Sequence, residues 1–284
     1  MDTHQDTHSH IGHERASGSD VAMAELLELD AEVLASYLAE LTGLLADRTD
    51  TAPARILDLG SGPGTGSLAL ARQFPTAQVT AVDLSAQMLH RLQKQAAAHG
   101  VSDRINTLAA NLDEPWTEIN EGGPYDLIWA AAFLHHVTDP ARTFAQAFEQ
   151  LRPGGLLAVT EMDFFPRFLP EDAGIGRPGL EARLHAVTNT QPRHEWTGQL
   201  EEAGFTVEKR DFEIRLKHAQ AGLALNGYAQ ICLAKLRSHA TDALDADDLA
   251  ALDALLDETQ PHSLARRNDL GVTTTRTAWI ARRP

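Results

Sequence analysis

Short apolar runs alternate with amphipathic stretches through the central part of the chain. The runs end near a glycine or an aspartate, and the stretches between them carry apolar residues three and four positions apart, which is typical of helices. The runs predict strands at 55–59, 78–83, 105–109, 125–130 and 156–160, and the stretches predict helices at 67–72, 85–99 and 139–150. Strands that alternate with helices predict a parallel, doubly wound α/β sheet that is covered on both faces.

The pattern changes on either side of this alternating part. Upstream, residues 21–46 have apolar positions at helical spacing and predict one or two amphipathic helices that cover an apolar surface. Downstream, residues 162–191 are rich in Pro, Gly and Phe and predict an irregular insertion before a helix at 195–203.

Two long strands are predicted near the end of the chain, at 205–216 and 272–281. The helical pair at 222–258 between them is too long for a hairpin loop and is expected to form part of a lid. The expected organisation is an N-terminal helical cap with a flexible tail at 1–50, and one domain at 51–284 with lid insertions at about 161–192 and 218–265.

Composition narrows the classes of protein and partner. With 284 residues, 43% of them hydrophobic, the chain can bury one sizeable core. Its 24 Lys and Arg against 40 Asp and Glu give a formal net charge of −16, which repels phosphate backbones and anionic lipids, so neither nucleic acid nor a membrane is an expected partner. The single cysteine, Cys232, forms no internal disulfide, and the start of the chain lacks the pattern of a secretory signal, so a cytoplasmic location is expected.

Four histidines lie close together near the start of the chain: His4, His8, His10 and His13. They alternate with polar residues and lack both partner cysteines and a fixed helical spacing. This pattern predicts a flexible tail, and no metal site is predicted.

The glycine-rich segment 58–66, DLGSGPGTG, follows a predicted strand and precedes a predicted helix. Its glycines let backbone N–H groups approach a ligand closely. The dinucleotide fingerprint fails, because its third glycine position is Thr65 or Ser67 depending on the frame, and no Lys-Ser/Thr pair follows as in a phosphate loop. Asp83 ends the next strand, where a carboxylate accepts hydrogen bonds from both hydroxyls of a ribose, or alternatively caps the helix that begins near Ser85.

Four segments in this order, DLGSGPGTG, VDLSAQML, NLDEPW and LRPGGLLAV, resemble class I S-adenosylmethionine-dependent methyltransferases over roughly residues 52–160. The resemblance implies a Rossmann-like sheet of seven strands that is mostly parallel, with an antiparallel last strand and helical lid elements. It also implies S-adenosylmethionine as cofactor.

The resemblance assigns roles to particular residues. Gly60, Ser61 and Gly62 would line the methionine part of the cofactor, with Asp58 as the first residue of the same motif. Asp83 would hold the ribose, and the remaining implied contacts are Leu84 and Met88 on the adenine, Asn111 at its amino group, the Leu112 backbone, and the Ala130 carbonyl at the methionine amino group. The family often has Asp where Asn111 stands, and the Asn side-chain carbonyl accepts the same hydrogen bond.

Methyl transfer from a sulfonium is an in-line displacement that depends on positioning and a dry pocket and requires no metal. His135, and more weakly His136, follow the fourth predicted strand and are candidate general bases for the methyl acceptor. The alternative is that both histidines line the pocket or make structural hydrogen bonds. Glu161 and Asp163 follow the fifth strand and would orient a histidine, hold a cationic acceptor, or simply be solvated.

The expected function is methyl transfer to O, N or C of a small metabolite or a peptide. Two alternatives stay open: a protein that binds S-adenosylmethionine without turnover, and an NAD-dependent oxidoreductase, against which the broken glycine frame argues. The apolar helices at 21–46 and 222–258 fit either a monomer or a homodimer.

Overall fold

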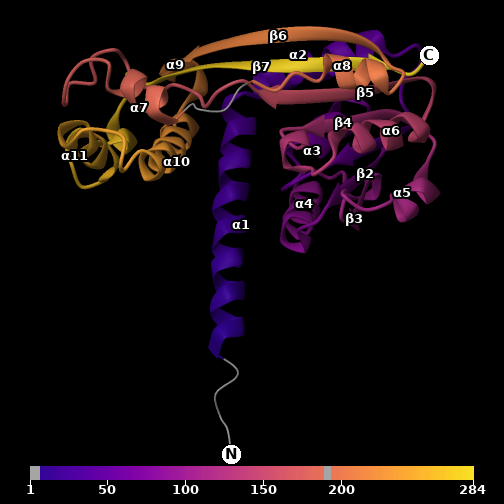
Figure 1. Cartoon of the computed structure of the whole chain (residues 1–284), viewed down its shortest axis with the longest axis horizontal. Coiled ribbons are helices and arrows are strands. Elements are labelled where there is room, and N and C mark those ends of the chain that lie inside the picture. Colours follow the sequence, from indigo (N-terminus) through magenta and orange to yellow (C-terminus); the bar gives the residue numbers. More distant parts are fainter. Residues whose placement is uncertain (1–6, 189–192) are drawn as a thin grey trace, which may run out of the picture.

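The computed structural model describes the backbone of residues 7–188 and 193–284, and the side chains of residues 20–188 and 193–284. Its strands form one seven-stranded sheet in the order β3-β2-β1-β4-β5-β7-β6 (Figure 1). The strands are β1 (Arg55–Leu59), β2 (Gln78–Asp83), β3 (Ile105–Ala109), β4 (Tyr125–Ala131), β5 (Leu151–Met162), β6 (Thr206–Lys217) and β7 (Gly271–Arg282).

Strands β1 to β5 pair in parallel, whereas β7 lies antiparallel between β5 and β6. The predicted fold class is therefore confirmed: a Rossmann-like α/β sheet, mostly parallel, with an antiparallel last strand. The strand order reverses direction between β1 and β4, and ligands of such sheets bind in the crevice at this point, beyond the carboxyl ends of the strands.

Helices cover both faces of the sheet. They are α1 (Thr7–Val33), α2 (Ala35–Arg48), α3 (Thr65–Gln73), α4 (Ala86–Ala98), α5 (Thr117–Gly122), α6 (Pro140–Gln150), α7 (Leu180–Thr188), α8 (Thr197–Glu202), α9 (His218–Ala221), α10 (Ala224–His239) and α11 (Ala246–Leu256), with short 3₁₀ turns η1 (Ser102–Arg104), η2 (Leu134–His136) and η3 (Leu264–Arg266). Because successive strand residues face opposite sides, Ile56 belongs to the apolar core that includes residues of α2, α3 and α4, while Leu57 belongs to the core that includes residues of α5, α6 and α8.

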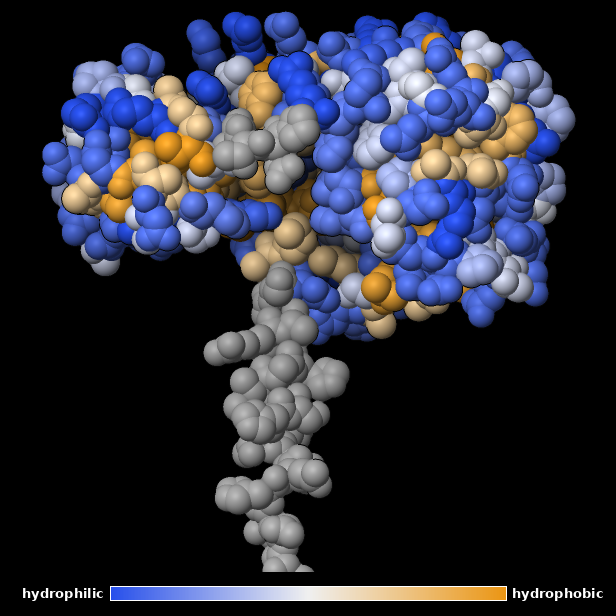
Figure 2. Space-filling view, viewed as in Figure 1, coloured by the Kyte–Doolittle hydropathy of each residue, from blue (hydrophilic) through white to orange (hydrophobic). Residues whose placement is uncertain are grey.

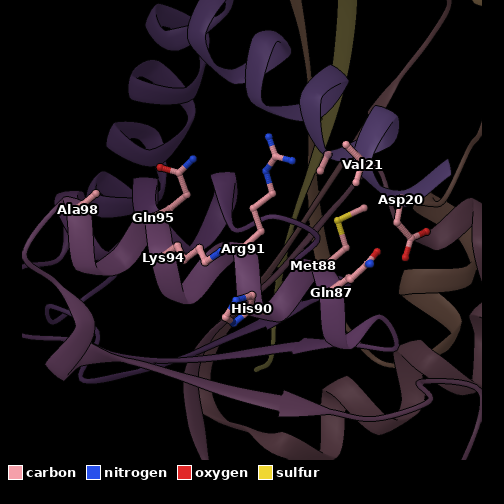
Figure 3. A pocket seen from close by; sticks show the side chains of 10 residues that line it. Asp20, Val21, Gln87, Met88, His90, Arg91, Lys94, Gln95 and Ala98 are labelled. Carbon is pink, nitrogen blue, oxygen red and sulfur yellow. The ribbon is translucent and has the colours of Figure 1, made fainter. Parts of the chain in front are cut away.

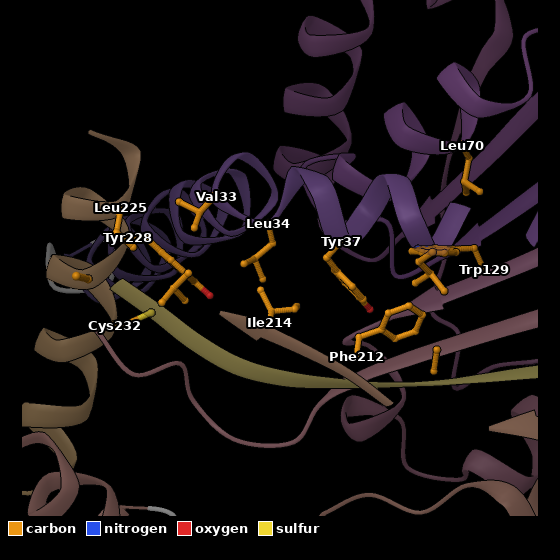
Figure 4. Packing of buried hydrophobic residues seen from close by; sticks show 14 of the residues in the cluster. Val33, Leu34, Tyr37, Leu70, Trp129, Phe212, Ile214, Leu225, Tyr228 and Cys232 are labelled. Atoms are coloured by element: carbon orange, nitrogen blue, oxygen red, sulfur yellow. The ribbon is translucent and has the colours of Figure 1, made fainter. Parts of the chain in front are cut away.

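Helices α7, α10 and α11 form a helical lobe beside the far ends of β6 and β7, at the left of Figure 1. Helix α1 runs between this lobe and the parallel strands and packs mainly on α10. Figure 4 shows the junction of α1 and α2, where Leu34 and Tyr37 are buried between α10 and the sheet residues Phe212 and Ile214. Figure 2 shows a largely hydrophilic face on which apolar residues gather between the lobe and the sheet.

Three elements differ from the sequence-based expectation. Helix α1 begins at Thr7, upstream of the helix expected from residue 21, because no proline interrupts the segment from Thr7 to Val33. His8, His10 and His13 therefore lie on helical backbone rather than in a flexible tail, and His4 lies outside the described residues. The segment expected to be irregular contains α7, and α5 was not expected.

A search of the described part of the chain finds no helix that is both long and apolar enough to cross a membrane.

Candidate functional site

The glycine loop lies between β1 and α3, at the point where the strand order reverses. Gly60, Gly62 and Gly64 have φ angles of 65°, 53° and 96°, which side chains other than glycine rarely adopt. At Gly60 there is also no space for a side chain, because a Cβ atom would lie 2.2 Å from the ring of Phe133. Ser61 N–H donates to the Val82 carbonyl over 2.9 Å, so the loop is fixed to β2.

Asp83, the last residue of β2, has both carboxylate oxygens fixed. Oδ2 accepts from Gly62 N–H and Oδ1 accepts from Ser85 N–H, each over 2.8 Å. The helix-cap role that was the alternative for Asp83 belongs instead to Ser85, whose Oγ accepts from Met88 N–H at the start of α4. Each carboxylate oxygen has more than one lone pair, so Asp83 retains acceptor capacity for a ligand hydroxyl.

Asp58 lies beneath the loop rather than on its surface. Its side chain is buried, and Oδ2 accepts a 2.6 Å hydrogen bond from Ser67 Oγ at the start of α3. Burial raises the pKa of Asp58 to about 7, and the charge of Asp83 acts in the same direction. Asp58 therefore supports the loop and the helix that follows it.

The residues predicted to contact adenine follow β2 and β3. Met88 and Leu112 are buried, whereas Leu84 is 72% exposed. Asn111 is exposed, and its Oδ1 accepts from Asp113 N–H over 3.1 Å, which leaves one lone pair for another donor.

Ala130, near the end of β4, is buried and lies in register with Leu59 of β1 and Val159 of β5. The structure thus brings the predicted cofactor residues to the carboxyl edge of four neighbouring strands.

Helix α1 covers this edge; the sequence predicted an N-terminal helical cap but not the surface that it covers. Leu27 lies against Gly62, 3.4 Å from the position of a Cβ atom there. Asp20 Oδ2 accepts a 2.8 Å hydrogen bond from Ser85 Oγ, and Arg91 donates two hydrogen bonds of 2.6 Å to Glu28. The only sequence signal was the apolar pattern of 21–46, which indicated that something is covered but not what.

A groove runs between α1 and α4 beside Met88 (Figure 3). Its wall from α1 is short and its wall from α4 is largely polar and basic; the residues from the two helices include Asp20, Val21, Gln87, Met88, Arg91 and Lys94. Met88, one of the residues predicted to contact adenine, therefore lies in the wall of this groove.

The loop after β4 carries the candidate bases. Ala132 has a φ of 48°, the one positive value found among the described residues other than glycine, and its N–H donates to the Thr160 carbonyl over 2.8 Å. Strained backbone of this kind often occurs at functional sites. His135 and His136 follow in η2, and His135 Nδ1 lies 2.9 Å from Glu161 Oε2.

His136 and Asp163 have surroundings that differ from those of His135 and Glu161. Partial burial, together with the neighbouring His135, lowers the pKa of His136. Asp163 accepts a 2.9 Å hydrogen bond from Thr277 Oγ1 and lies 3.5 Å from Arg193, so it is engaged within the protein rather than solvated. Within the described residues, no three His, Cys, Asp or Glu side chains are grouped as a metal site would require.

Residues 56–155 match the family model of a methyltransferase domain. These residues form a methyltransferase domain. The matched residues of this domain span β1 to β5 and contain the loop, Asp83 and both candidate bases.

Two curated relatives are similar to part of the chain. The chain is 33% identical to a trans-aconitate 2-methyltransferase of Yersinia pestis over 168 residues, which is 59% of this chain and 56% of that protein. It is 37% identical to an uncharacterized protein of Synechococcus over 105 residues, which is 37% of this chain and 24% of that protein. The chain thus spans about a quarter to about half of the length of these relatives.

Among solved structures, a putative methyltransferase from Bacillus halodurans has the same fold. The TM-score is 0.52 at 16% sequence identity, and the match covers 88% of this chain and 99% of that one. At this identity the likeness extends to the fold alone.

The cofactor of this family is S-adenosylmethionine, and the residues of the methyltransferase domain fit it. Ser61 Oγ is buried without a hydrogen-bond partner among the described residues, and it lies in the loop that would receive the amino-acid part. Asp83 presents a fixed carboxylate for the ribose, and Leu84 exposes an apolar side chain directly after it. A buried oxygen without a partner is unfavourable unless a ligand or a water molecule satisfies it.

Proposed function

We propose that the chain binds S-adenosylmethionine at the carboxyl edge of β1 to β4 and transfers its methyl group to a small acceptor. The observation that carries this proposal is the fixed Asp83 carboxylate, held by Gly62 and Ser85 beside a loop whose Ser61 Oγ lacks a partner within the described structure. When bound, the cofactor supplies an activated methyl group on a sulfonium. The protein's part is to bind, orient, exclude water and move the acceptor's proton.

Different residues bind different parts of the cofactor. Asp83 accepts hydrogen bonds from the ribose hydroxyls, and Ser61 Oγ donates to the carboxylate of the amino-acid part. Leu84, Met88 and Leu112 supply the apolar contacts of the adenine. Helix α1, through Leu27, keeps water away from the loop.

His135 is the proposed general base. It lies on the strained loop that packs against Gly60 through Phe133, and this loop follows β4 at the same sheet edge as the cofactor residues. A base is needed when the acceptor is a hydroxyl or an ammonium group, because either must lose a proton during transfer.

A second candidate acceptor is a carboxylate, which the name of the Yersinia relative supports. A carboxylate is already ionised at neutral pH, so it accepts a methyl group without a base. The two acceptor classes therefore differ in their need for His135.

Cofactor binding is tested by calorimetry with S-adenosylhomocysteine, the demethylated product. Asp83→Ala removes hydrogen bonds to a charged acceptor, each worth about 1.5–3 kcal/mol, so we expect Kd to rise at least about tenfold. Asp103→Asn, which removes the same charge from the exposed turn η1, is the matched control. Thermal melting checks that both variants are folded. If S-adenosylhomocysteine produces no binding heat with the wild-type protein, the proposal is wrong.

Transfer is tested with a tritiated methyl donor and three kinds of acceptor: trans-aconitate, small phenols and primary amines. We expect His135→Ala to lower turnover at least about 100-fold on a hydroxyl or amine acceptor, with binding of S-adenosylhomocysteine unchanged. A loss below about threefold rules out general-base catalysis of ordinary size at this residue. Activity on trans-aconitate alone, insensitive to this substitution, would assign the carboxylate class.

Two measurements test the remaining classes of protein, the first of them the same transfer assay. Binding without transfer to any acceptor would favour a protein that holds the cofactor without turnover. Fluorescence titration with NADH tests the oxidoreductase class, which the broken glycine frame disfavours.

A further inference from the structure

His135 is held by a buried carboxylate of the neighbouring strand. Its Nδ1 lies 2.9 Å from Oε2 of Glu161, whose side chain is 3% exposed. Glu161 lies on β5 in register with Thr277 of β7, and the residue before it, Thr160, is in register with Ala131 of β4. The carboxylate therefore has a fixed direction of approach to the imidazole.

Stacking interactions hold the plane of the same ring. The His194 ring stacks on His135 with centroids 5.6 Å apart and an interplanar angle of 21°. His194 in turn stacks on buried Trp196, at 5.3 Å and 5°. On His135 itself the His136 ring lies at 4.0 Å with a tilt of 46°. Together the stack and the hydrogen bond restrict rotation of the His135 side chain.

We propose that Glu161 is a positioning residue that keeps the proton of neutral His135 on Nδ1. A carboxylate accepts a hydrogen bond but cannot donate one when ionised, so the Nδ1–H tautomer is the one that satisfies this contact. The lone pair is then on Nε2, at the opposite side of the ring from β5, where it can take the acceptor's proton. This inference rests on the proposed role of His135 as the base.

The geometry also explains why a buried carboxylate is placed here. As His135 takes up a proton it becomes a cation, and the buried carboxylate 2.9 Å from Nδ1 stabilises that cation. Oε1 of Glu161 is buried without a hydrogen-bond partner among the described residues, so the carboxylate is not neutralised by a second donor there. Asp163, two residues further along the chain, is instead paired with Thr277 and Arg193.

The test measures the tautomer directly and needs no acceptor. Long-range ¹H–¹⁵N spectra of the ¹⁵N-labelled full chain at about pH 9, where an ordinary histidine is neutral, distinguish the protonated from the unprotonated ring nitrogen. His135→Gln assigns the signals. We expect protonated Nδ1 in the wild-type protein, and a wild-type spectrum with protonated Nε2 overturns the proposal.

Variants of the carboxylate provide the second measurement. Glu161→Met fills similar space without an acceptor, and we expect the proton to move largely to Nε2, the tautomer that free histidine prefers. Glu161→Gln retains an acceptor oxygen and should restore the Nδ1–H signal, while Asp163→Asn, the matched loss of charge two residues away, should leave it unchanged. Persistence of the Nδ1–H signal in Glu161→Met shows that Glu161 does not select the tautomer.

Turnover then separates this inference from the proposed function. With the acceptor found in the tritium assay, Glu161→Met should lower kcat at least about tenfold, while Kd for S-adenosylhomocysteine stays within about twofold, because only the proton transfer is affected. If Glu161→Met shifts the tautomer without lowering kcat, and His135→Ala remains active, then His135 is not the general base. The contact by which Glu161 positions His135 stands in that case. A loss of kcat without a tautomer shift overturns the positioning role.

Discussion

Asp58 is 2% exposed, lies under the glycine loop and has a pKa raised to about 7 by burial. In the folded chain it therefore keeps its proton up to about pH 7, whereas in the unfolded chain it loses the proton near its ordinary pKa of about 4. Between these values the folded state binds more protons than the unfolded state. The contribution of Asp58 to stability is thus fully present below about pH 4 and is lost as the pH rises towards 7.

Replacing this carboxyl group with an amide should remove the pH dependence that it causes. Asp58→Asn keeps an oxygen that accepts the hydrogen bond from Ser67, and we expect the fall in the free energy of unfolding between about pH 5 and 7.5 to be smaller than in the wild-type protein by about 1–3 kcal/mol. Urea unfolding at both pH values measures it. Because Glu181 and His185 also titrate in or near this range, the comparison is with the wild type and with Asp103→Asn. Equal pH dependence in all three proteins would contradict the raised pKa.

At the scale of elements, the sequence predicts those contacts that follow from the local residue pattern and from the geometry of a parallel sheet. Asp83 and Gly62 are 21 residues apart, yet their meeting could be expected, because parallel strands end at one edge of the sheet. The contact of Leu27 with Gly62 could not be expected, because α1 is not part of the sheet and its direction is set by packing on α10. The stacking of His194 on His135 could not be expected either, since no spacing in the sequence links the two residues.

Helix α1 joins parts of the molecule that are distant in sequence. Near its end, Asp30 accepts hydrogen bonds from Tyr228 of the helical lobe and from Arg276 of β7. Two residues earlier Glu28 pairs with Arg91 of α4, and further upstream Asp20 bonds with Ser85, two residues after Asp83. One continuous helix therefore connects the lobe, the last strand and the glycine loop. The apolar pattern of 21–46 indicated that this segment covers an apolar surface, but not that it covers the loop.

At the scale of the whole molecule, charge distinguishes the methyl donor from its product. The formal net charge of −16 produces a negative potential that extends beyond the surface and is screened by salt. The sulfonium gives S-adenosylmethionine one positive charge more than S-adenosylhomocysteine, while their other groups are the same. The negative field therefore favours the donor over the product, and more so at low salt.

Because the two ligands differ in charge, their dissociation constants should depend differently on salt concentration. Raising the ionic strength from about 0.01 to 0.15 M shortens the screening length from about 30 to 8 Å, so we expect Kd for S-adenosylmethionine to rise about threefold, which corresponds to a loss of about 1 kT. Kd for S-adenosylhomocysteine should stay within about 1.5-fold, since it has no net charge for the long-range field to act on. Calorimetry with both ligands in the same buffers measures the two changes, and the product is the matched control for salt effects on the pocket itself. If both affinities change equally, the field of the acidic surface does not reach the site, and the neutral and cationic ligands are then distinguished by short-range contacts alone.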